Sequence, residues 1–534
     1  MANLAITTSV PQTIHETKPA ESVFAVNEIL EQIFQNCDKS SLKNCVVVGK
    51  RWSEVALDVL WYEVTDMDTL LAPLGQIISR SRTVSERGPN GWPSRSVSEM
   101  IYEFSPPPTH QNWLRFHHHY APRVRILRLE DHSGDIKVPK LVNLLRHIRT
   151  CGPILPKLRA IHWIGLSSLG LAEPLFTFAH EGIQELTVED TEDYCTANSV
   201  FCEAIQTYMP HLINLSLDLQ PALEYIQPVC NVVKGLSNLQ SVTIPSFSDA
   251  SDAISALSHL KGLKKLHLTQ SNAVTELHDH VDPPRVYFPA LESLDISYDY
   301  QTASRFFCSK IPHLRSIHVS TSVGEQPSHV QILLSSISRA CPCVAQALRP
   351  ILQVPSISTF EIEHPFPADF GLEDVTEIAT AWPNLKSLKL CCDPFVSQQP
   401  TSKQLDLRAI LPFAQHCPQI EQLGLLINAK SSSMPSNAEI DALPSLFKKL
   451  QIFSVGISEI QHEGAVAQWL SLVCTPGCVI QCGPRWYEPG EEELELVTRW
   501  KRVGELLPHL LATRVWYEQK VIALEHKLSE LGSN

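Results

Sequence analysis

The chain has 534 residues, of which 43 are basic and 57 acidic, so its formal net charge is −14 at pH 7. This acidic balance argues against nucleic acid or an anionic membrane as the main partner. The length exceeds what one compact core supports, and it favours a small module followed by an elongated domain.

The N-terminus carries no obvious targeting segment. Residues 1–20 lack a basic stretch followed by an apolar one, so we expect a disordered lead and no secretory signal. No run of about eighteen apolar residues occurs, and no membrane span is predicted. The 15 cysteines are scattered through apolar positions, as is typical of reduced thiols. We therefore expect a soluble intracellular protein, cytoplasmic or nuclear.

Residues 21–64 have the apolar spacing of a small module of three helices. Asn27 is the expected cap of the first helix, Ser40 or Ser41 the cap of the second, and Trp52 marks the start of the third. So small a unit cannot bury all of its large side chains alone, so the surplus is expected to face a partner. The side chains assigned to that docking surface are Ile29, Leu30, Ile33, Phe34, Leu42, Val48 and Trp52. The alternative is that they form only an internal core.

The same segment resembles an F-box, the motif that docks substrate receptors onto a ubiquitin ligase adaptor. The residues that carry the resemblance are Glu28-Ile29-Leu30, Ile33-Phe34, Leu42, Val48, Lys50-Arg51-Trp52 and Ala56. The chain departs from the family pattern at Ala25-Val26, where Leu-Pro is usual, and at Gly49, which replaces a common Cys. The resemblance implies a Skp-type adaptor as partner and, through it, a cullin–RING ligase.

A short apolar pattern recurs along residues 122–490, in about 12 irregular copies spaced roughly 30 residues apart. Each copy ends in Leu-x-Leu or its equivalent, the alternation of a short strand, and helical stretches lie between the copies. The pattern predicts an α/β leucine-rich-repeat solenoid with parallel strands on its concave face and helices on its convex face. It resembles the degenerate repeats of fungal F-box proteins. A doubly wound sheet is the competing fold, but no glycine-rich phosphate turn follows any strand.

One residue in each predicted strand, between the last two apolar positions, must face outward from the sheet. These residues are polar and mixed in sign, which suits recognition of a protein through hydrogen bonds. The candidate substrate-binding residues are His162, His267, Asp295, His318, Glu361 and Lys389. Simple solvation of this face, or substrate binding by the loops, remains an alternative.

The segments that flank the solenoid have different compositions. Residues 65–121 are expected to be a linker and N-terminal cap, with a turn-rich connector over 80–110. Trp113, Phe116 and Tyr120 then predict a short capping helix. Residues 491–534 are expected to form a C-terminal helical cap broken near Pro508.

The end of that C-terminal segment has the 3-4 spacing of a coiled-coil seam, which fewer than three heptads support only weakly. The residues with this spacing are Val521, Leu524, Leu528 and Leu531. An oligomer contact or a disordered tail is the alternative to a cap.

No catalytic or cofactor motif was found, so we expect no enzyme activity, no cofactor and no metal. His117-His118-His119 are adjacent and would point in different directions on a helix. The polar group Glu276, His278, Asp279, His280 and Asp282 could gather a cation, but a loop outside the repeats explains it as well. Cys474, Cys478 and Cys482 lack metal-binding spacing and are expected to be core thiols.

These observations predict a substrate receptor of a Skp–cullin–F-box ubiquitin ligase, whose repeats bind an unknown protein substrate. An adaptor-binding scaffold without a degradation role is the alternative. A GTPase-activating repeat protein is a third hypothesis, but the irregular repeats offer no positioned catalytic arginine or asparagine.

Overall fold

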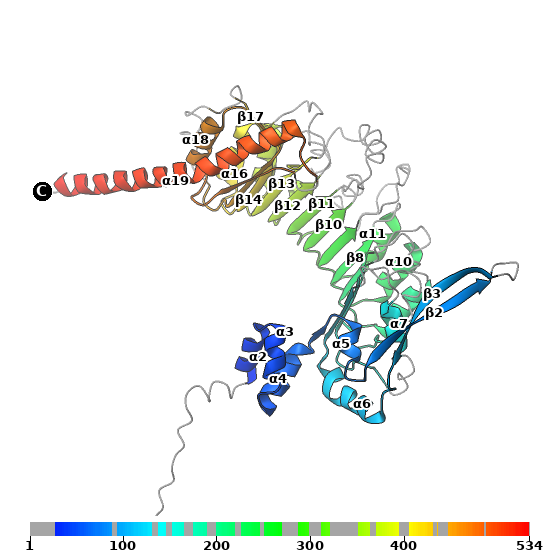
Figure 1. The fold of residues 1–534 in the computed structure, drawn as a ribbon. Helices are drawn as coiled ribbons and strands as arrows, with labels where there is room; N and C mark the ends of the chain where they lie inside the picture. The colour runs from blue at the N-terminus through cyan, green and yellow to red at the C-terminus, as the bar shows by residue number, and fades with distance from the viewer. Residues whose placement is uncertain are drawn as a thin grey trace, which may run out of the picture. The chain divides into compact units, whose positions relative to one another are not determined.

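The computed structural model describes residues 27–87, 93–130, 137–145, 152–164, 175–189, 199–218, 226–245, 250–269, 287–297, 311–320, 351–363, 370–394, 405–430, 435, 447–484 and 487–532. The chain divides into two compact units, Met1–Glu185 and Leu186–Asn534 (Figure 1). The predicted disordered lead lies outside the described residues.

The first unit begins with three helices: α2 (Asn27–Gln35), α3 (Lys39–Cys45) and α4 (Lys50–Leu60). The prediction of three helices is confirmed, but their starts differ. Asp38 caps α3 by accepting a hydrogen bond from the Ser41 N–H at 2.7 Å, so α3 begins before either predicted serine cap. Asn27 instead accepts from Arg51 Nε at 2.8 Å, which ties α2 to the first turn of α4.

The three helices share a small core of their own. Leu30, Phe34, Leu42, Val55 and Ala56 are buried together. The indole of Trp52 packs edge-on against Phe34, with 5.5 Å between ring centroids. A core of this size holds about forty residues only weakly, so the module depends on support from the chain that follows it.

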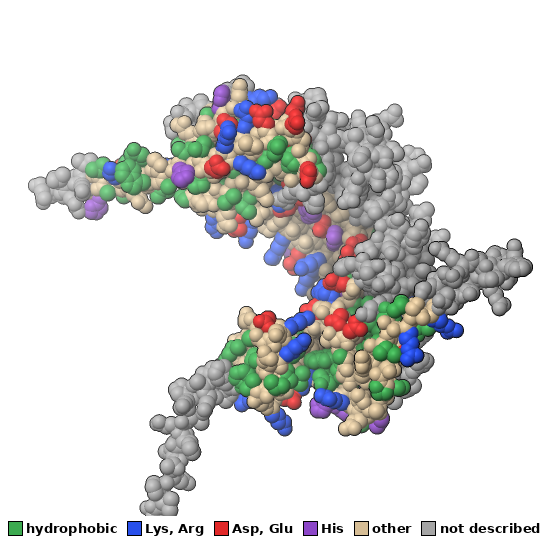
Figure 2. Space-filling view, viewed as in Figure 1, with side chains coloured by type: hydrophobic (Ala, Val, Ile, Leu, Met, Phe, Trp, Pro, Cys, Tyr) green, Lys and Arg blue, Asp and Glu red, His purple; other side chains and the backbone are tan. Residues whose placement is uncertain are grey.

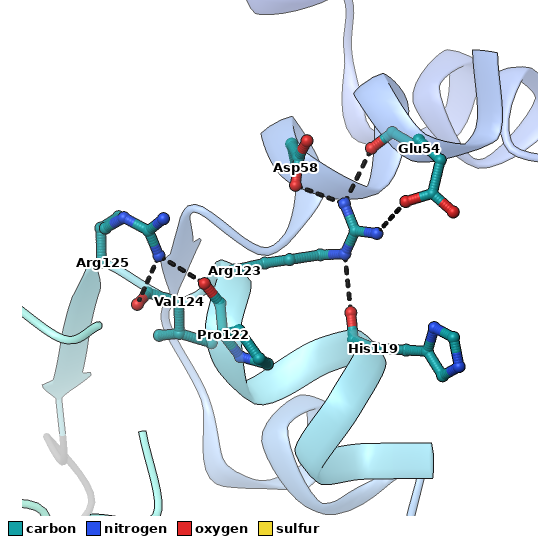
Figure 3. Close-up of polar contacts among 7 residues, drawn as sticks. All are labelled: Glu54, Asp58, His119, Pro122, Arg123, Val124 and Arg125. Carbon is teal, nitrogen blue, oxygen red and sulfur yellow. Dashed lines mark hydrogen bonds and ion pairs between the residues drawn. The ribbon is translucent and has the colours of Figure 1, made fainter. Parts of the chain in front are cut away.

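Arg123 supplies part of that support (Figure 3). Its guanidinium is bonded to the carboxylates of Glu54 and Asp58 on α4. It also donates to the Glu54 carbonyl at 2.9 Å and, from Nε, to the His119 carbonyl at 2.6 Å. Only 12% of the Arg123 side chain is exposed, so one partly desolvated cation connects α4 to the segment that precedes strand β4 (Ile126–Glu130).

The predicted connector over 80–110 is largely ordered, which corrects the expectation of a turn-rich linker. It forms an antiparallel hairpin of β2 (Ile77–Arg87) and β3 (Pro93–Phe104). The sequence did not predict these strands, because serine and arginine stand where apolar residues would mark a strand. Such strands can still form, because backbone hydrogen bonds between antiparallel strands do not require an apolar face. The Arg80–Glu103 ion pair, at 3.1 Å, joins the two strands.

Fourteen strands belong to a parallel sheet, three in the first unit and eleven from β6 onward. Those of the first unit lie in the order β1-β4-β5, and the others follow chain order from β6 to β18. The strands are β1 (Glu63–Val64), β4 (Ile126–Glu130), β5 (Ala160–Ile164), β6 (Glu185–Glu189), β7 (Asn214–Asp218), β8 (Ser241–Pro245), β9 (Lys265–Thr269), β10 (Ser293–Ser297), β11 (Ser316–Ser320), β12 (Thr359–Glu363), β13 (Ser387–Leu390), β14 (Gln422–Leu425), β16 (Ile452–Gly456) and β18 (Val479–Cys482). Two further short strands, β15 (Asn428–Ala429) and β17 (Glu459–Ile460), pair with each other.

Every predicted repeat copy contains one of these strands, so the repeat prediction is confirmed. Within each unit, each strand pairs with the strand of the next repeat, which is the arrangement of a solenoid. The first strand lies earlier than the predicted boundary at 122, since β1 pairs with β4. Its two residues are too few to show an alternating pattern, which explains why the sequence did not reveal it.

Helices and short helical turns connect the strands. Neighbouring helices pack on one another, as in the pairs α9–α10, α10–α11 and α15–α16. The helices after α4 are α5 (Met67–Leu71), α6 (His110–Arg115), α7 (Lys137–Asn143), α9 (Ser199–Tyr208), α10 (Ile226–Gly235), α11 (Ala250–Ser258), α15 (Leu372–Ala381), α16 (Leu411–His416), α18 (Glu463–Val473) and α19 (Glu491–Gly532). The turns are η1 (Phe116–Tyr120), η2 (Ala121–Arg123), η5 (Ile351–Gln353) and η6 (Leu407–Ile410). In the described part of the chain, no helix is both long and apolar enough to cross a bilayer.

The C-terminal helix α19 is continuous through Pro508, which contradicts the predicted break. A proline inside a helix removes one hydrogen bond and crowds the preceding turn. Here Val503, Leu507 and Leu511 are buried on both sides of the proline. This packing holds the backbone helical across the missing bond.

The Arg123 contact can be tested by charge reversal. Arg123→Glu places a carboxylate against Glu54 and Asp58, and we expect it to destabilise the docking of α4 by about 1–3 kcal/mol. Hydrogen exchange of the α4 amides measures this, with faster exchange expected. Arg80→Glu, at an exposed arginine of the hairpin, is the matched control. Unchanged α4 exchange in the Arg123 variant would contradict the assignment.

Candidate functional site

The predicted outward residues of the second unit lie in one register across the sheet. His267 pairs with Asp295, Asp295 with His318, His318 with Glu361, and Glu361 with Lys389. Each strand buries alternate residues, so this row and the residues two positions away share the other, partly exposed side. Figure 2 shows charged side chains of both signs and histidines on this part of the molecule.

Asp295 is the centre of the first group in this row. Its Oδ1 lies 3.0 Å from His318 Nδ1, and its Oδ2 lies 3.7 Å from His267 Nε2. The second nitrogen of His318, Nε2, lies 4.0 Å from Glu363 Oε2. His318 is therefore held between carboxylates of β10 and β12. About a third of its side chain remains open to solvent.

Glu361 and Lys389 form the second group. Lys389 Nζ donates to Glu361 Oε2 at 3.1 Å, and Ser387 Oγ donates to Glu361 Oε1 at 2.8 Å. Burial pushes the pKa of Glu361 upward, but these two donors, together with His318, lower it overall. The carboxylate is therefore charged and fully engaged, so it acts as a fixed acceptor in this row.

The surroundings of His318 shift the pKa of its imidazole. Its hydrogen bond to Asp295 raises its pKa above 6.5, burial opposes that shift, and the charges of Asp295, Glu363 and Glu361 reinforce it. A protonated His318 offsets part of the negative charge of the three carboxylates around it. Without that proton, the negative charge of the group is less compensated.

His162 belongs to the first unit and has different surroundings. It pairs in register with Arg128, whose Nε donates to Glu63 at 2.9 Å. Burial, followed by the charge of Arg128, lowers the pKa of His162, although Glu185 Oε1 lies 3.6 Å from its Nε2. The structure thus brings together five of the six predicted substrate-binding residues, and His162 stands apart from them in the other unit.

The row ends at Gly424 and Ser454, which are buried. A Cβ at Gly424 would meet Cys392 Sγ and Lys389 Cγ, both at 3.0 Å. Ser454 donates instead to Gln481 Oε1 at 2.9 Å. The partly exposed polar surface therefore spans β9 to β13 in the second unit.

Glu363, Ser297 and Ser320 on the same face were missed by the sequence analysis. Ser297 and Ser320 are hydrogen-bonded at 2.9 Å, and Glu363 pairs with Ser320 in the strand register. These residues lie two positions beyond the selected row. The period of two in a strand would have identified them, had the row been widened.

The predicted docking residues of the helical module separate into three sets. Leu30, Phe34 and Leu42 are buried in the module's own core, so they cannot contact a partner unless the module opens. Ile29 and Trp52 are half-buried. The remaining predicted residues are Ile33, 40% exposed, and Val48, 64% exposed.

Val47 was missed in the predicted set and is the most exposed of these side chains, at 83%. Figure 2 shows hydrophobic side chains gathered over this module. Ile33, Val47 and Val48 are named here the module's apolar surface. The helical period could not separate Ile33 from the core, because Ile33 has the same spacing as Leu30 and Phe34. Val47 and Val48 lie in the turn between α3 and α4, where a helical period does not apply.

No group of three or more histidine, cysteine or acidic residues that could hold a metal occurs among the residues described above. His117 and His118 stack edge to face at 5.6 Å within η1. The acidic and histidine group from Glu276 to Asp282 lies outside the described residues. Cys474 and Cys478 are buried free thiols, as predicted, and Cys482 is half-buried.

Comparison with known proteins adds little. No family model matches the chain, and no curated protein is similar to it in sequence. A solved structure described as "Crystal structure of TLR13-ssRNA13 complex" is similar to 71% of this chain, with 10% sequence identity and a TM-score of 0.29. The chain matches 48% of that structure, about half its length. The repeat fold therefore rests on the strand order and register described above.

The electrostatics of His318 give a direct test. We expect its imidazole to titrate above pH 6.5, and Asp295→Asn to lower the midpoint because it removes the charged acceptor. An NMR titration of the full chain measures this, with His318→Gln assigning the signal. A midpoint at or below 6.5 in the unmodified chain would overturn the assigned role of Asp295.

The same shift links stability to pH. Because folding raises the pKa of His318, its stabilising contribution is complete below about pH 6.5 and is lost as pH rises through the folded pKa. Thermal unfolding should therefore separate the native chain from His318→Gln most widely at acidic pH. The difference in melting temperature should narrow toward alkaline pH, and a gap that widens there would contradict the linkage.

Proposed function

We propose that this protein is the substrate-recognition subunit of a Skp–cullin–F-box ubiquitin ligase. The helical module would bind the adaptor, and the repeats would bind a protein substrate. The observation that carries the proposal is a three-helix module that has its own core and still exposes Ile33, Val47 and Val48. Exposed aliphatic side chains on so small a module are typical of a surface that a partner covers.

The F-box resemblance supports the choice of partner. Trp52 lies against Phe34 and so helps to define the core, while Val48 of the same motif is exposed. The motif therefore contains both residues that shape the module and residues available for contact. Burying an aliphatic side chain at such a contact contributes about 1.5–3 kcal/mol, the scale of an interface hot spot.

The row from His267 to Lys389 supports the second part of the proposal. It alternates histidine, carboxylate and ammonium groups, and several are already oriented by neighbouring strands. A rigid polar face of mixed charge favours a protein partner with complementary hydrogen-bonding groups over a uniformly charged polymer. The repeats would then act by holding the substrate near the ubiquitin carrier, which raises its effective concentration.

The adaptor contact is tested with exposed positions, since core positions confound binding with folding. Ile33→Asp and Val48→Asp each put a charge on the module's apolar surface, and we expect at least a tenfold loss of affinity for a purified Skp-type adaptor. Val200→Asp, at a valine of α9 that is 63% exposed, is the matched control. Calorimetry with the full chain measures the affinities. Equal binding by all three variants and the native chain would overturn the adaptor proposal.

Phe34→Ala is expected to destabilise the helical module, unlike the substitutions at the exposed positions Ile33 and Val48. Phe34 is 1% exposed in the module's core, so its truncation should cost about 3–5 kcal/mol of module stability. Adaptor binding would then fail because α2 to α4 unfold. Circular dichroism and hydrogen exchange of those helices distinguish this from the loss of a contact. A Phe34→Ala chain with intact α2 exchange and no adaptor binding would contradict the assignment of Phe34 to the core.

The degradation role needs its own test. Reconstitution with adaptor, cullin and RING subunits should give a complex that contains the full chain. Binding of the adaptor without assembly of the cullin complex would instead favour an interaction scaffold.

A further inference from the structure

The last part of α19 carries exposed apolar side chains. The helix is anchored by Trp500, Val503, Leu507 and Leu511, all buried. Beyond Arg514, which donates to the carbonyls of Ser471 and Cys474, the helix continues to Gly532. Figure 1 shows this continuation of α19 as the red helix that ends near the C-terminus.

The apolar side chains of this continuation are exposed. Tyr517 is 59% exposed, Val521 51% and Leu524 56%. Their spacing is four and then three residues, and the sequence places Leu528 and Leu531 at the next two positions of the same spacing. These positions form a stripe of about two heptads, with Val521 and Leu528 at a, and Tyr517, Leu524 and Leu531 at d. The stripe over 517–531 is named here the C-terminal seam.

We propose that the C-terminal seam pairs with the same seam of a second copy of this chain, in a parallel two-stranded coiled coil. This inference does not depend on the proposed ligase function. A β-branched residue at a with leucine at d, as at Val521 and Leu524, favours two parallel strands. A two-fold axis along the helices would then bury both stripes against each other.

Charge selects a second copy in the parallel orientation. In this register Lys520 occupies a g position and Glu525 the following e position. In a parallel pair, g of one helix lies beside the next e of the other, so Lys520 meets Glu525 of the second copy twice by symmetry. In an antiparallel pair, g faces g and e faces e. Lysines 520 and 527 would then oppose each other, as would glutamates 518 and 525.

The anchored helix lowers the cost of pairing. An isolated segment of about 15 residues is barely helical in water, because nucleation is unfavourable. Here the seam continues a helix already fixed by buried residues, so pairing needs little new ordering of the backbone. The seam is short, at about 22 Å for 15 residues, so we expect a weak and reversible dimer.

Two other exposed apolar side chains lie outside the seam. Trp516 lies under the ammonium of Lys520, with 4.1 Å between Nζ and the ring centroid. Ile522 is 64% exposed at a b position. Ile522 therefore provides an internal control for Leu524. The two residues lie on the same helix and are similarly exposed, but Ile522 would not face the second copy.

Sedimentation velocity of the full chain over a wide range of concentration tests the dimer. We expect the sedimentation coefficient to rise with concentration. Leu524→Lys should weaken the association about tenfold or more, while Ile522→Lys leaves it unchanged. Circular dichroism checks that both variants keep their helix content. A chain that is monomeric at every concentration would overturn the proposal, as would equal effects of the two variants.

Charge exchange tests the orientation. K520E and E525K should each weaken self-association severalfold, because each puts like charges at the g–e contact. The double variant should restore association, and a mixture of the two single variants should form heterodimers in preference to homodimers. In an antiparallel pair, K520E would strengthen association by opposing lysine 527. That result, or no recovery in the double variant, would overturn the parallel arrangement.

Discussion

The in-register parallel pairing of short strands is the constraint on which the rest of this structure depends. Each strand buries alternate residues, so its register decides which side chains reach the polar face. A slip of one residue would turn His318 inward and Ile317 outward. The observed register instead brings Asp295, His318 and Glu361, distant in sequence, to adjacent positions. The chemistry of the candidate site is therefore a product of backbone pairing, and its polarity persists because the buried alternate residues hold the strands in place.

The helical module faces a different constraint, because it has too few residues to bury every apolar side chain. Its core contains Leu30, Phe34 and Leu42, whereas Val47 and Val48 remain exposed in the segment between α3 and α4. Arg123 offsets the small core by joining α4 to the chain that follows, through partners on both the side chains and the backbone. Stability and an accessible apolar surface thus coexist, since support comes from outside the three helices.

The C-terminal helix combines two roles along one element. Its first half covers the end of the repeats with Trp500, whose indole N–H donates to the Ser458 carbonyl at 2.8 Å. Such packing tolerates Pro508, because buried neighbours on either side maintain the helical backbone. Its second half keeps the same spacing of apolar residues after the supporting core ends. The helix that caps the repeats thus continues into the surface proposed for self-association.

The sequence by itself determined where most of the repeat strands lie and which of their residues face outward. Those features follow from a period of two, which is a local property of a strand. The tertiary structure decided what depends on distant packing. It separated buried Phe34 from exposed Val48, and it paired two polar strands into a hairpin. It also kept α19 helical through Pro508, and it surrounded His318 with carboxylates from two neighbouring strands. The spacing of apolar residues along a chain indicates on which side of a helix or strand each residue lies. The neighbours that a side chain meets on that side depend on how the helices and strands pack. Its burial, its charge state and its pKa therefore depend on the tertiary structure.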